Sequence, residues 1–295
     1  MVERCTEMKR GIDHLVLGVR DLDRARETYT RMGFTTTPRA AHPFGTGNSL
    51  VQLQGNFLEL LTVVDESKFA QPTTGQFEFG TFNKTYLDAR EGMSMLVFEG
   101  HDAARDHADF TENGLDTYEP FHFERKATLP NGAEVTVAFS LVFVTDERMP
   151  DAVFFTCQQH APEYFWKPEY QRHDNGALVI SEVVMVAEAP VTLTGLIGGM
   201  QSTDAVTVVN GSLWVATTRG YVTVMTPGDF EERFGLAPTG PQTPHFGAFQ
   251  IQVTNLDKTE ALLTNNDIAF RRTNAALQVG PETAFGCVLE FVAEG

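Results

Sequence analysis

The strongest constraint on the fold of this chain is an internal repeat, because the unit formed by residues 11–63 recurs three more times. The unit reads as one strand, one helix and three further strands, and its first and last strands carry His14 and Glu59. The helix is expected to begin after Asp21, whose carboxylate can accept hydrogen bonds from the first turn, and to end at Gly33. A repeat of this kind predicts that every copy folds as the same supersecondary unit.

The second and third copies follow at shifts of 81 and 168 residues from the first copy. In the second copy a strand is expected at 93–100 and a helix at 101–113. The third copy should have its helix after Pro190, but three glycines lie between positions 195 and 199. Each glycine costs about 1 kcal/mol relative to alanine in a helix interior. We therefore expect a short or irregular helix in the third copy.

The fourth copy matches the first most clearly. A shift of 234 residues aligns Leu22 with Leu256 and Asp23 with Asp257, and the last strand, CVLEFV, matches NFLELL. The four copies predict an α+β protein of four βαβββ modules, paired into two domains with half-open curled mixed sheets. The expected boundaries are 11–160 for the N-terminal module pair, 161–174 for a connector and 175–295 for the C-terminal module pair.

Charge and cysteine content exclude several classes of protein. The net charge is −17, from 39 acidic and 22 basic residues, which argues against nucleic acid and anionic membranes as partners. The three cysteines are far apart and form no CxxC motif, so neither a disulfide framework nor a zinc ribbon is indicated. Residues 1–11 contain no apolar stretch of signal-peptide length, and charges interrupt the apolar stretch at 177–200. We expect a cytoplasmic protein with a small-molecule partner, compatible with a homodimer.

The segments DHLVLGVRDLDRARETY and NFLELL resemble the module of the vicinal oxygen chelate superfamily. That superfamily includes glyoxalase I, extradiol dioxygenases and bleomycin-resistance proteins, and glyoxalase-like domain proteins are the most similar group. The resemblance implies that two modules pair around a divalent metal, with ligands from the first and fourth strand of each module. It leaves open whether the metal is zinc, magnesium, manganese, nickel or iron.

The eight strand positions that this resemblance selects are incompletely filled with metal ligands. The first-strand positions hold His14, Met95, Glu182 and Ala248, and the fourth-strand positions hold Glu59, Thr156 or Cys157, Thr223 and Glu290. His14 and Glu59 are the candidate metal ligands, and Glu182 and Glu290 are further candidates. Pairing the first and fourth modules would collect His14, Glu59 and Glu290, but the sequence does not fix the pairing. An extradiol dioxygenase needs two histidines and one carboxylate, and the second pair has no histidine at these positions, so we reject that activity.

The segment between the second and third copies, 157–177, is rich in aromatic residues and histidine. Its prolines and its Asp-Asn-Gly turn indicate a connector without helix or strand. One interpretation is an amphipathic linker, and the other is a cavity mouth whose substrate-binding residues include His160, Trp166 and His173. Phe121 and Phe123 are candidates for an apolar wall around the ligand. Cys157 is expected to be an inert buried thiol.

Two functions are compatible with these residues. The first is a glyoxalase-like enzyme, a lyase, isomerase or hydrolase, that acts on a small oxygen-rich metabolite with Glu59 as ligand or base and His14 as ligand or acid. The second is a metal-free protein that binds or sequesters a small molecule, similar to bleomycin-resistance proteins. In both, strand alternation should turn Leu15 and Leu58 away from the side that His14 and Glu59 face.

Overall fold

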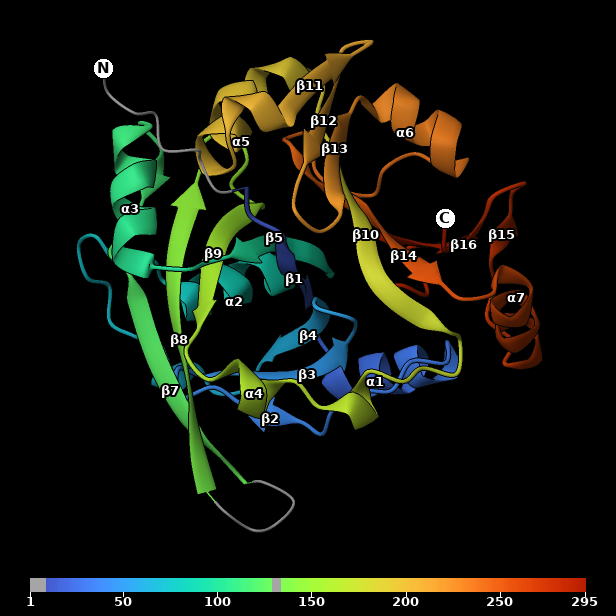
Figure 1. Cartoon of the computed structure of the whole chain (residues 1–295), viewed down its shortest axis with the longest axis horizontal. Coiled ribbons are helices and arrows are strands. Elements are labelled where there is room, and N and C mark those ends of the chain that lie inside the picture. The colour runs from blue at the N-terminus through green and yellow to red at the C-terminus, as the bar shows by residue number, and fades with distance from the viewer. Residues whose placement is uncertain (1–8, 129–133) are drawn as a thin grey trace.

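The described part of the chain folds into two curled mixed sheets and seven α-helices (Figure 1). The computed structural model of the chain describes residues 9–128 and 134–295. The predicted turn at 130–132 lies outside these residues. Among the described residues, no helix combines the length and the apolar character needed to cross a bilayer.

The first sheet has nine strands in the order β2-β3-β4-β1-β5-β9-β8-β6, with β7 paired to β8. These strands are β1 (Ile12–Gly18), β2 (Ala40–Ala41), β3 (Thr46–Gln52), β4 (Phe57–Val63), β5 (Gly92–Glu99), β6 (Asp116–Thr117), β7 (Phe121–Thr128), β8 (Glu134–Thr145) and β9 (Val153–Gln159). The first strands of the two modules, β1 and β5, run antiparallel at the centre, and each pairs in parallel with the last strand of its own module.

The second sheet repeats this plan with eight strands in the order β11-β12-β13-β10-β14-β17-β16-β15. They are β10 (Ala177–Val186), β11 (Val206–Val209), β12 (Ser212–Ala216), β13 (Tyr221–Met225), β14 (His245–Val253), β15 (Arg271–Arg272), β16 (Ala276–Val279) and β17 (Val288–Ala293). The predicted fold class is confirmed, with the first module paired to the second and the third paired to the fourth. The boundaries of the two halves as separate folding domains stay a prediction.

The helices are α1 (Leu22–Arg31), α2 (Phe79–Ala89), α3 (Ala103–Glu112), α4 (Pro162–Phe165), α5 (Thr194–Met200), α6 (Pro227–Phe234) and α7 (Leu256–Asn265). As expected, the third module has only the short α5, after a 3₁₀ turn at Pro190–Leu193. Helices α2 and α6, which follow the last strands of the first and third modules, were not predicted. The prediction of a connector without helix is wrong for α4, a single turn that begins at a proline, whose fixed φ suits the first helical position.

Helix α1 forms as the sequence predicts. Asp21 caps it by accepting a hydrogen bond from the Arg24 amide at 3.0 Å, and its apolar face, which includes Tyr29, is buried. Gly33 ends the helix with φ of +87°, and a Cβ there would lie 2.9 Å from the Asn175 backbone nitrogen. A glycine is therefore required both by the backbone conformation and by the close approach of the chain that leads into β10.

The hydrophobic core divides along the faces of the sheets. One large cluster joins the convex faces of both sheets and the helices, and it contains Leu15 and Leu58, as strand alternation predicts. Two smaller clusters occupy the concave faces. We call the concave face of the first sheet, around His14 and Glu59, the first cup, and that of the second sheet, around Glu182 and Glu290, the second cup.

Candidate functional site

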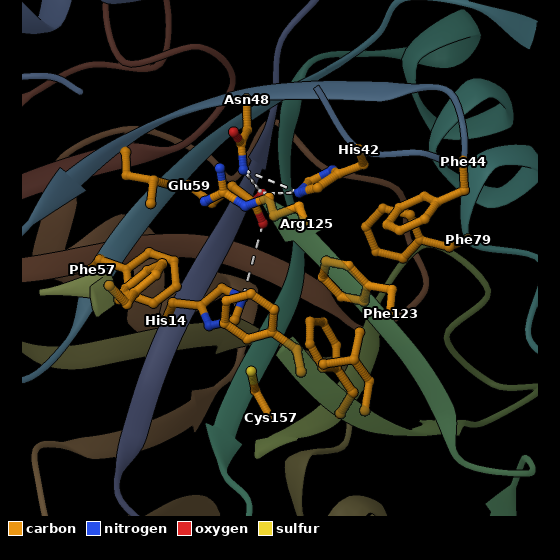
Figure 2. Close-up of a pocket in the computed structure, with 15 residues that line it drawn as sticks. His14, His42, Phe44, Asn48, Phe57, Glu59, Phe79, Phe123, Arg125 and Cys157 are labelled. Carbon is orange, nitrogen blue, oxygen red and sulfur yellow. Dashed lines mark hydrogen bonds and ion pairs between the residues drawn. The ribbon is translucent and has the colours of Figure 1, made fainter. Parts of the chain in front are cut away.

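The first cup encloses a cavity of about 60 Å³ (Figure 2). Its walls are mainly apolar, with seven phenylalanine and two leucine side chains. Five polar side chains reach the cavity from four strands and one loop, and these are His14, His42, Asn48, Glu59 and Arg125. Because apolar walls lower the local dielectric, charges and hydrogen bonds act strongly here.

His14 and Glu59 face the same cavity from the neighbouring parallel strands β1 and β4. The distance between His14 Nε2 and Glu59 Oε2 is 3.9 Å, and both side chains are more than nine-tenths buried. The His14 ring stacks on Phe57 with centroids 4.2 Å apart. Since 3.9 Å is longer than a hydrogen bond, the two groups border a shared space in which each can contact a ligand.

Asp13 fixes the orientation of His14. A register shift in the β1–β5 ladder between Ile12 and His14 lets the Asp13 carboxylate lie beside the ring. Asp13 Oδ1 is 2.5 Å from His14 Nδ1, and Gln159 donates to Asp13 Oδ2 at 2.9 Å. Because a carboxylate only accepts hydrogen bonds, His14 Nδ1 carries the hydrogen and Nε2 presents its lone pair to the cavity.

Asn48 and His42 hold the other side of the Glu59 carboxylate. Asn48 Nδ2 donates to Glu59 Oε1 at 2.5 Å and lies 3.3 Å from His42 Nε2. Because the Asn48 amide nitrogen donates, His42 Nε2 is the acceptor, and in the neutral ring Nδ1 donates to Thr46 Oγ1 at 2.8 Å. Burial lowers the pKa of His42, and Arg125 and His14 add to this effect while Glu59 opposes it. His42 is therefore neutral near pH 7.

Arg125 brings a positive charge to the cavity from β7. Figure 2 shows its guanidinium on the same side of the cavity as Glu59. Burial lowers the pKa of Arg125, and the charge of Glu59 partly offsets this. An arginine stays charged in spite of such a shift, so the cavity presents one cation and one carboxylate.

Within its described residues, the second module contributes no strong metal ligand to the first cup. Of the two candidates for its fourth-strand position, Cys157 lines the cavity and Thr156 does not. Burial raises the pKa of the Cys157 thiol well above its usual value, and the charges of Asp13 and Glu59 raise it further. Cys157 is thus held as a thiol, in agreement with its expected inertness.

The polar groups of the first cup do not fit a metal ion in this arrangement. In residues 9–128 and 134–295, no three His, Cys, Asp or Glu side chains converge closely enough to hold one. The Asn48 amide, which donates hydrogen bonds, lies between His42 Nε2 and Glu59 Oε1. Since both atoms already face a donor, we derive no chemical step from a metal.

In the second cup, an arginine lies between the two candidate carboxylates. Arg233 of α6 contacts Glu182 at 2.6 and 2.8 Å and Glu290 at 2.6 Å. Glu182 also accepts from Thr223 and Tyr221. The two carboxylates are therefore in a different cup from His14 and Glu59, and the metal role predicted for them stays a prediction.

The network around Glu290 is likewise satisfied. Gln250 and Gln278 each donate to its carboxylate at 2.7 Å. Burial raises the pKa of Glu290, but the charge of Arg233 and these hydrogen bonds outweigh it, so the pKa is lowered. Phe230 and Phe234 of α6 fill the remaining apolar space. The second cup is thus closed by the chain's own helix.

The other predicted binding residues lie at different distances from the cavity. Phe123 lines it, whereas Phe121 packs behind Phe123 and Trp166 packs against the surrounding cluster. His160 is exposed and contacts Ser140 at 2.8 Å. His173 accepts from the Thr35 amide and donates to the Gln52 carbonyl, so it ties the connector to β3.

The connector also supplies a wall residue that was not predicted. Phe165 lines the cavity, and the side chain of Gln52 holds its surroundings by donating to the Phe165 carbonyl and accepting from the Lys167 amide. Among the polar groups, Asp13, His42, Asn48 and Arg125 were missed. The available signal was their polarity in otherwise apolar segments, but only the folded chain brings them together.

Comparison with known proteins supports the fold. A family model described as a glyoxalase-like domain matches residues 12–198. A hypothetical protein from Staphylococcus aureus is similar in structure at 13% identity with a TM-score of 0.69, and the alignment covers 97% of this chain and 100% of that one. A search of curated proteins finds no matching sequence.

Two structures of enzymes are also similar over 97% of this chain. A variant of 4-hydroxymandelate synthase from Streptomyces coelicolor has 11% identity, a TM-score of 0.56 and 93% of its own chain covered. The 2,2',3-trihydroxybiphenyl 1,2-dioxygenase from Sphingomonas wittichii has 9% identity, a TM-score of 0.54 and 91% of its own chain covered. At such low identity these similarities support the fold alone.

Proposed function

Because the chain belongs to the glyoxalase-like domain family of the vicinal oxygen chelate superfamily, we propose that it is an enzyme acting on a small oxygen-bearing metabolite in the first cup. The observation that carries the proposal is the oriented pair of His14 and Glu59. Asp13 directs His14 Nε2 into the cavity, and Asn48 holds Glu59 with Oε2 facing His14. Perturbed or paired titratable groups in an enclosed apolar cavity are typical of acid–base sites.

The reaction class that this pair supports is isomerisation of a compound with adjacent hydroxyl and carbonyl groups. Glu59 takes a proton from the hydroxyl-bearing carbon, and the electrons of that C–H bond form the double bond of an enediolate. His14 Nε2 takes the hydroxyl proton and returns it to the former carbonyl oxygen, while Glu59 returns its proton to the former carbonyl carbon. The atoms and electrons balance without an oxidant or reductant, and proton transfers of this kind contribute about 10²–10⁴-fold each.

Proton exchange with solvent tests this proposal without knowledge of the natural substrate. Pyruvate, pyruvamide and hydroxyacetone have five or six non-hydrogen atoms and protons next to a carbonyl. In D₂O, the native protein should accelerate the loss of these proton signals in NMR spectra for at least one compound. Glu59→Gln and His14→Gln should each slow the exchange by at least about 100-fold, and the exposed control Glu124→Gln should retain it.

The outcomes separate the candidate functions. A native protein that binds these compounds but does not accelerate exchange would be a binding protein, and the enzyme proposal would be wrong. Elemental analysis of untagged protein checks the metal, since about one divalent ion per chain would contradict the metal-independent proton transfer described here.

A further inference from the structure

One charged group in the first cup has no hydrogen-bonding or ion-pair partner among the residues that the structure describes. Arg125 is half-buried on β7 and lines the cavity. Within residues 9–128 and 134–295, its guanidinium forms neither a hydrogen bond nor an ion pair. By comparison, the half-buried arginine of the second cup, Arg233, binds two carboxylates.

In the described part of the chain, Glu59 forms no ion pair with Arg125, although both reach the same cavity and the charge of Glu59 partly offsets the burial of Arg125. Glu59 Oε1 accepts from Asn48 at 2.5 Å, and Glu59 Oε2 faces His14 at 3.9 Å. Arg125 comes within ion-pair distance of neither oxygen among the contacts of the described chain. The cavity therefore presents a cation and a proton acceptor on the same side, without an ion pair between them.

A desolvated guanidinium without an anion is unfavourable, and a bound anion would relieve that cost. Burial already lowers the pKa of Arg125, which reports the same desolvation. A carboxylate matches the planar fork of a guanidinium and forms two parallel hydrogen bonds with it. The chain as a whole carries a charge of −17, so attraction of an anion must come from this local cation.

We propose that the ligand of the first cup is a small carboxylate, whose anionic group binds Arg125 and whose carbonyl- or hydroxyl-bearing carbon lies against Glu59 and His14. This rests on the proposed function for the reacting end of the ligand, but the carboxylate contact is independent of any reaction. The enclosed volume of about 60 Å³ holds about four to six water-sized atoms, at roughly 10–15 Å³ each. The enclosed part of the ligand is thus a short chain of about that many non-hydrogen atoms, with its apolar end against the phenylalanine walls.

Pyruvate and pyruvamide are matched probes, because they have the same number of non-hydrogen atoms and differ in charge. Binding should be measured by isothermal titration calorimetry with native protein, Arg125→Gln, Arg125→Lys and Lys126→Gln. Lys126 is exposed on the opposite face of β7 and pairs with Glu134 at 3.2 Å. Lys126→Gln therefore removes the same charge from the same strand without touching the cavity.

We expect native protein and Lys126→Gln to bind pyruvate more tightly than pyruvamide. Arg125→Gln should weaken pyruvate binding by at least about 30-fold, as for loss of one partner of a buried charge pair, and should leave pyruvamide binding within about threefold. Arg125→Lys should give an intermediate loss, because lysine keeps the charge without the fork.

Equal affinity of native protein for the two probes would overturn the proposal, and this comparison needs no variant to fold. Unchanged pyruvate binding by a folded Arg125→Gln would overturn it as well. Pyruvate binding that depends on Arg125, without proton exchange, would support the anion site and refute the enzyme. Exchange that is equally fast for pyruvamide and in Arg125→Gln would support the enzyme and refute the anion site.

Discussion

The substitution Arg233→Met tests how the second cup is stabilised. Methionine keeps an apolar stem and removes the guanidinium that binds Glu182 and Glu290 at 2.6–2.8 Å. The side chains of Glu182 and Glu290 are 0% and 5% exposed. In the variant, two buried carboxylates would face each other without a cation.

The expected cost follows from the burial of this network. Removing one partner of a buried ion pair costs about 3–5 kcal/mol, and because Arg233 is 26% exposed we take the lower end, about 3 kcal/mol. With an unfolding entropy of about 2.1 cal/mol/K per residue, unfolding of roughly 120 residues as one unit gives a Tm decrease of about 12 °C. If all 295 residues unfold together, the decrease is about 5 °C.

The pH dependence of the stability difference between the native protein and Arg233→Met shows whether the unpaired carboxylates cause it. In the native protein the folded-state pKa of Glu290 is lowered, so its contribution to stability is present above the ordinary value of 4.5 and is lost as the pH falls through the folded value. Without Arg233, burial dominates and raises that pKa, so the ionised form destabilises the variant above about 4.5 and protonation relieves it. The stability difference should be largest near pH 7 and should shrink below pH 4.5.

Differential scanning calorimetry and urea unfolding at pH 7 and at pH 4 measure this difference. Arg272→Met is the matched control, since Arg272 belongs to the same sheet but forms only exposed ion pairs with Asp257 and Glu260. That control should lose less than about 1 kcal/mol. An Arg233→Met protein as stable as the native one, or a deficit that is the same at both pH values, would refute the reasoning.

Three further predictions concern other parts of the chain. Asp13→Asn should slow proton exchange by about 10- to 100-fold, because the variant loses the partner that orients His14, and it should keep pyruvate affinity within about threefold. An equal loss of exchange rate and pyruvate affinity would show that Asp13 has only a structural role. Burial lowers the pKa of His173, although the hydrogen bond to the Gln52 carbonyl and the charge of Asp174 oppose this effect. The free energy of unfolding of the native protein should therefore fall as the pH drops below 6.5, and it should fall less steeply in His173→Asn. An unchanged slope of this free energy against pH, measured by urea unfolding, would contradict the prediction. Amide exchange should be faster at Thr194–Met200 than at Leu22–Arg31, because glycine weakens the former helix; equal protection would show otherwise.

Much of the fold could be predicted because the modules repeat. Each copy of the module repeats the same order of strands and helix, and strand alternation alone places Leu15 and His14 on opposite faces of the sheet. Pairing of neighbouring modules was expected, but the alternative of the first module with the fourth stayed open, because the pairing depends on contacts between the first strands, β1 with β5 and β10 with β14. Helices α2 and α6 lie outside the repeated pattern, and their packing into the cups is set by tertiary contacts.

The polar residues of the candidate site were predictable only where a residue sits at a repeated position. His14 and Glu59 do, and both face the cavity, while their roles stay predictions. Asp13 was missed because alternation assigns it to the face opposite His14, and the register shift in β1 overrides that rule. Arg125 comes from a strand of the second module and reaches the cavity lined by Glu59 only when the first sheet curls.

The position of Phe165 limits how far the halves of this protein can be treated as separable parts. A gene fragment that stops at residue 160 would encode every strand of the first sheet but would omit the aromatic ring and the hydrogen-bonding backbone that the connector contributes beside Gln52. Such a fragment would present an open hollow to solvent, even if its sheet formed. Shuffling or fusing halves among relatives should therefore place the junction after Asn175, so that the connector residue that lines the cavity stays with the strands it contacts.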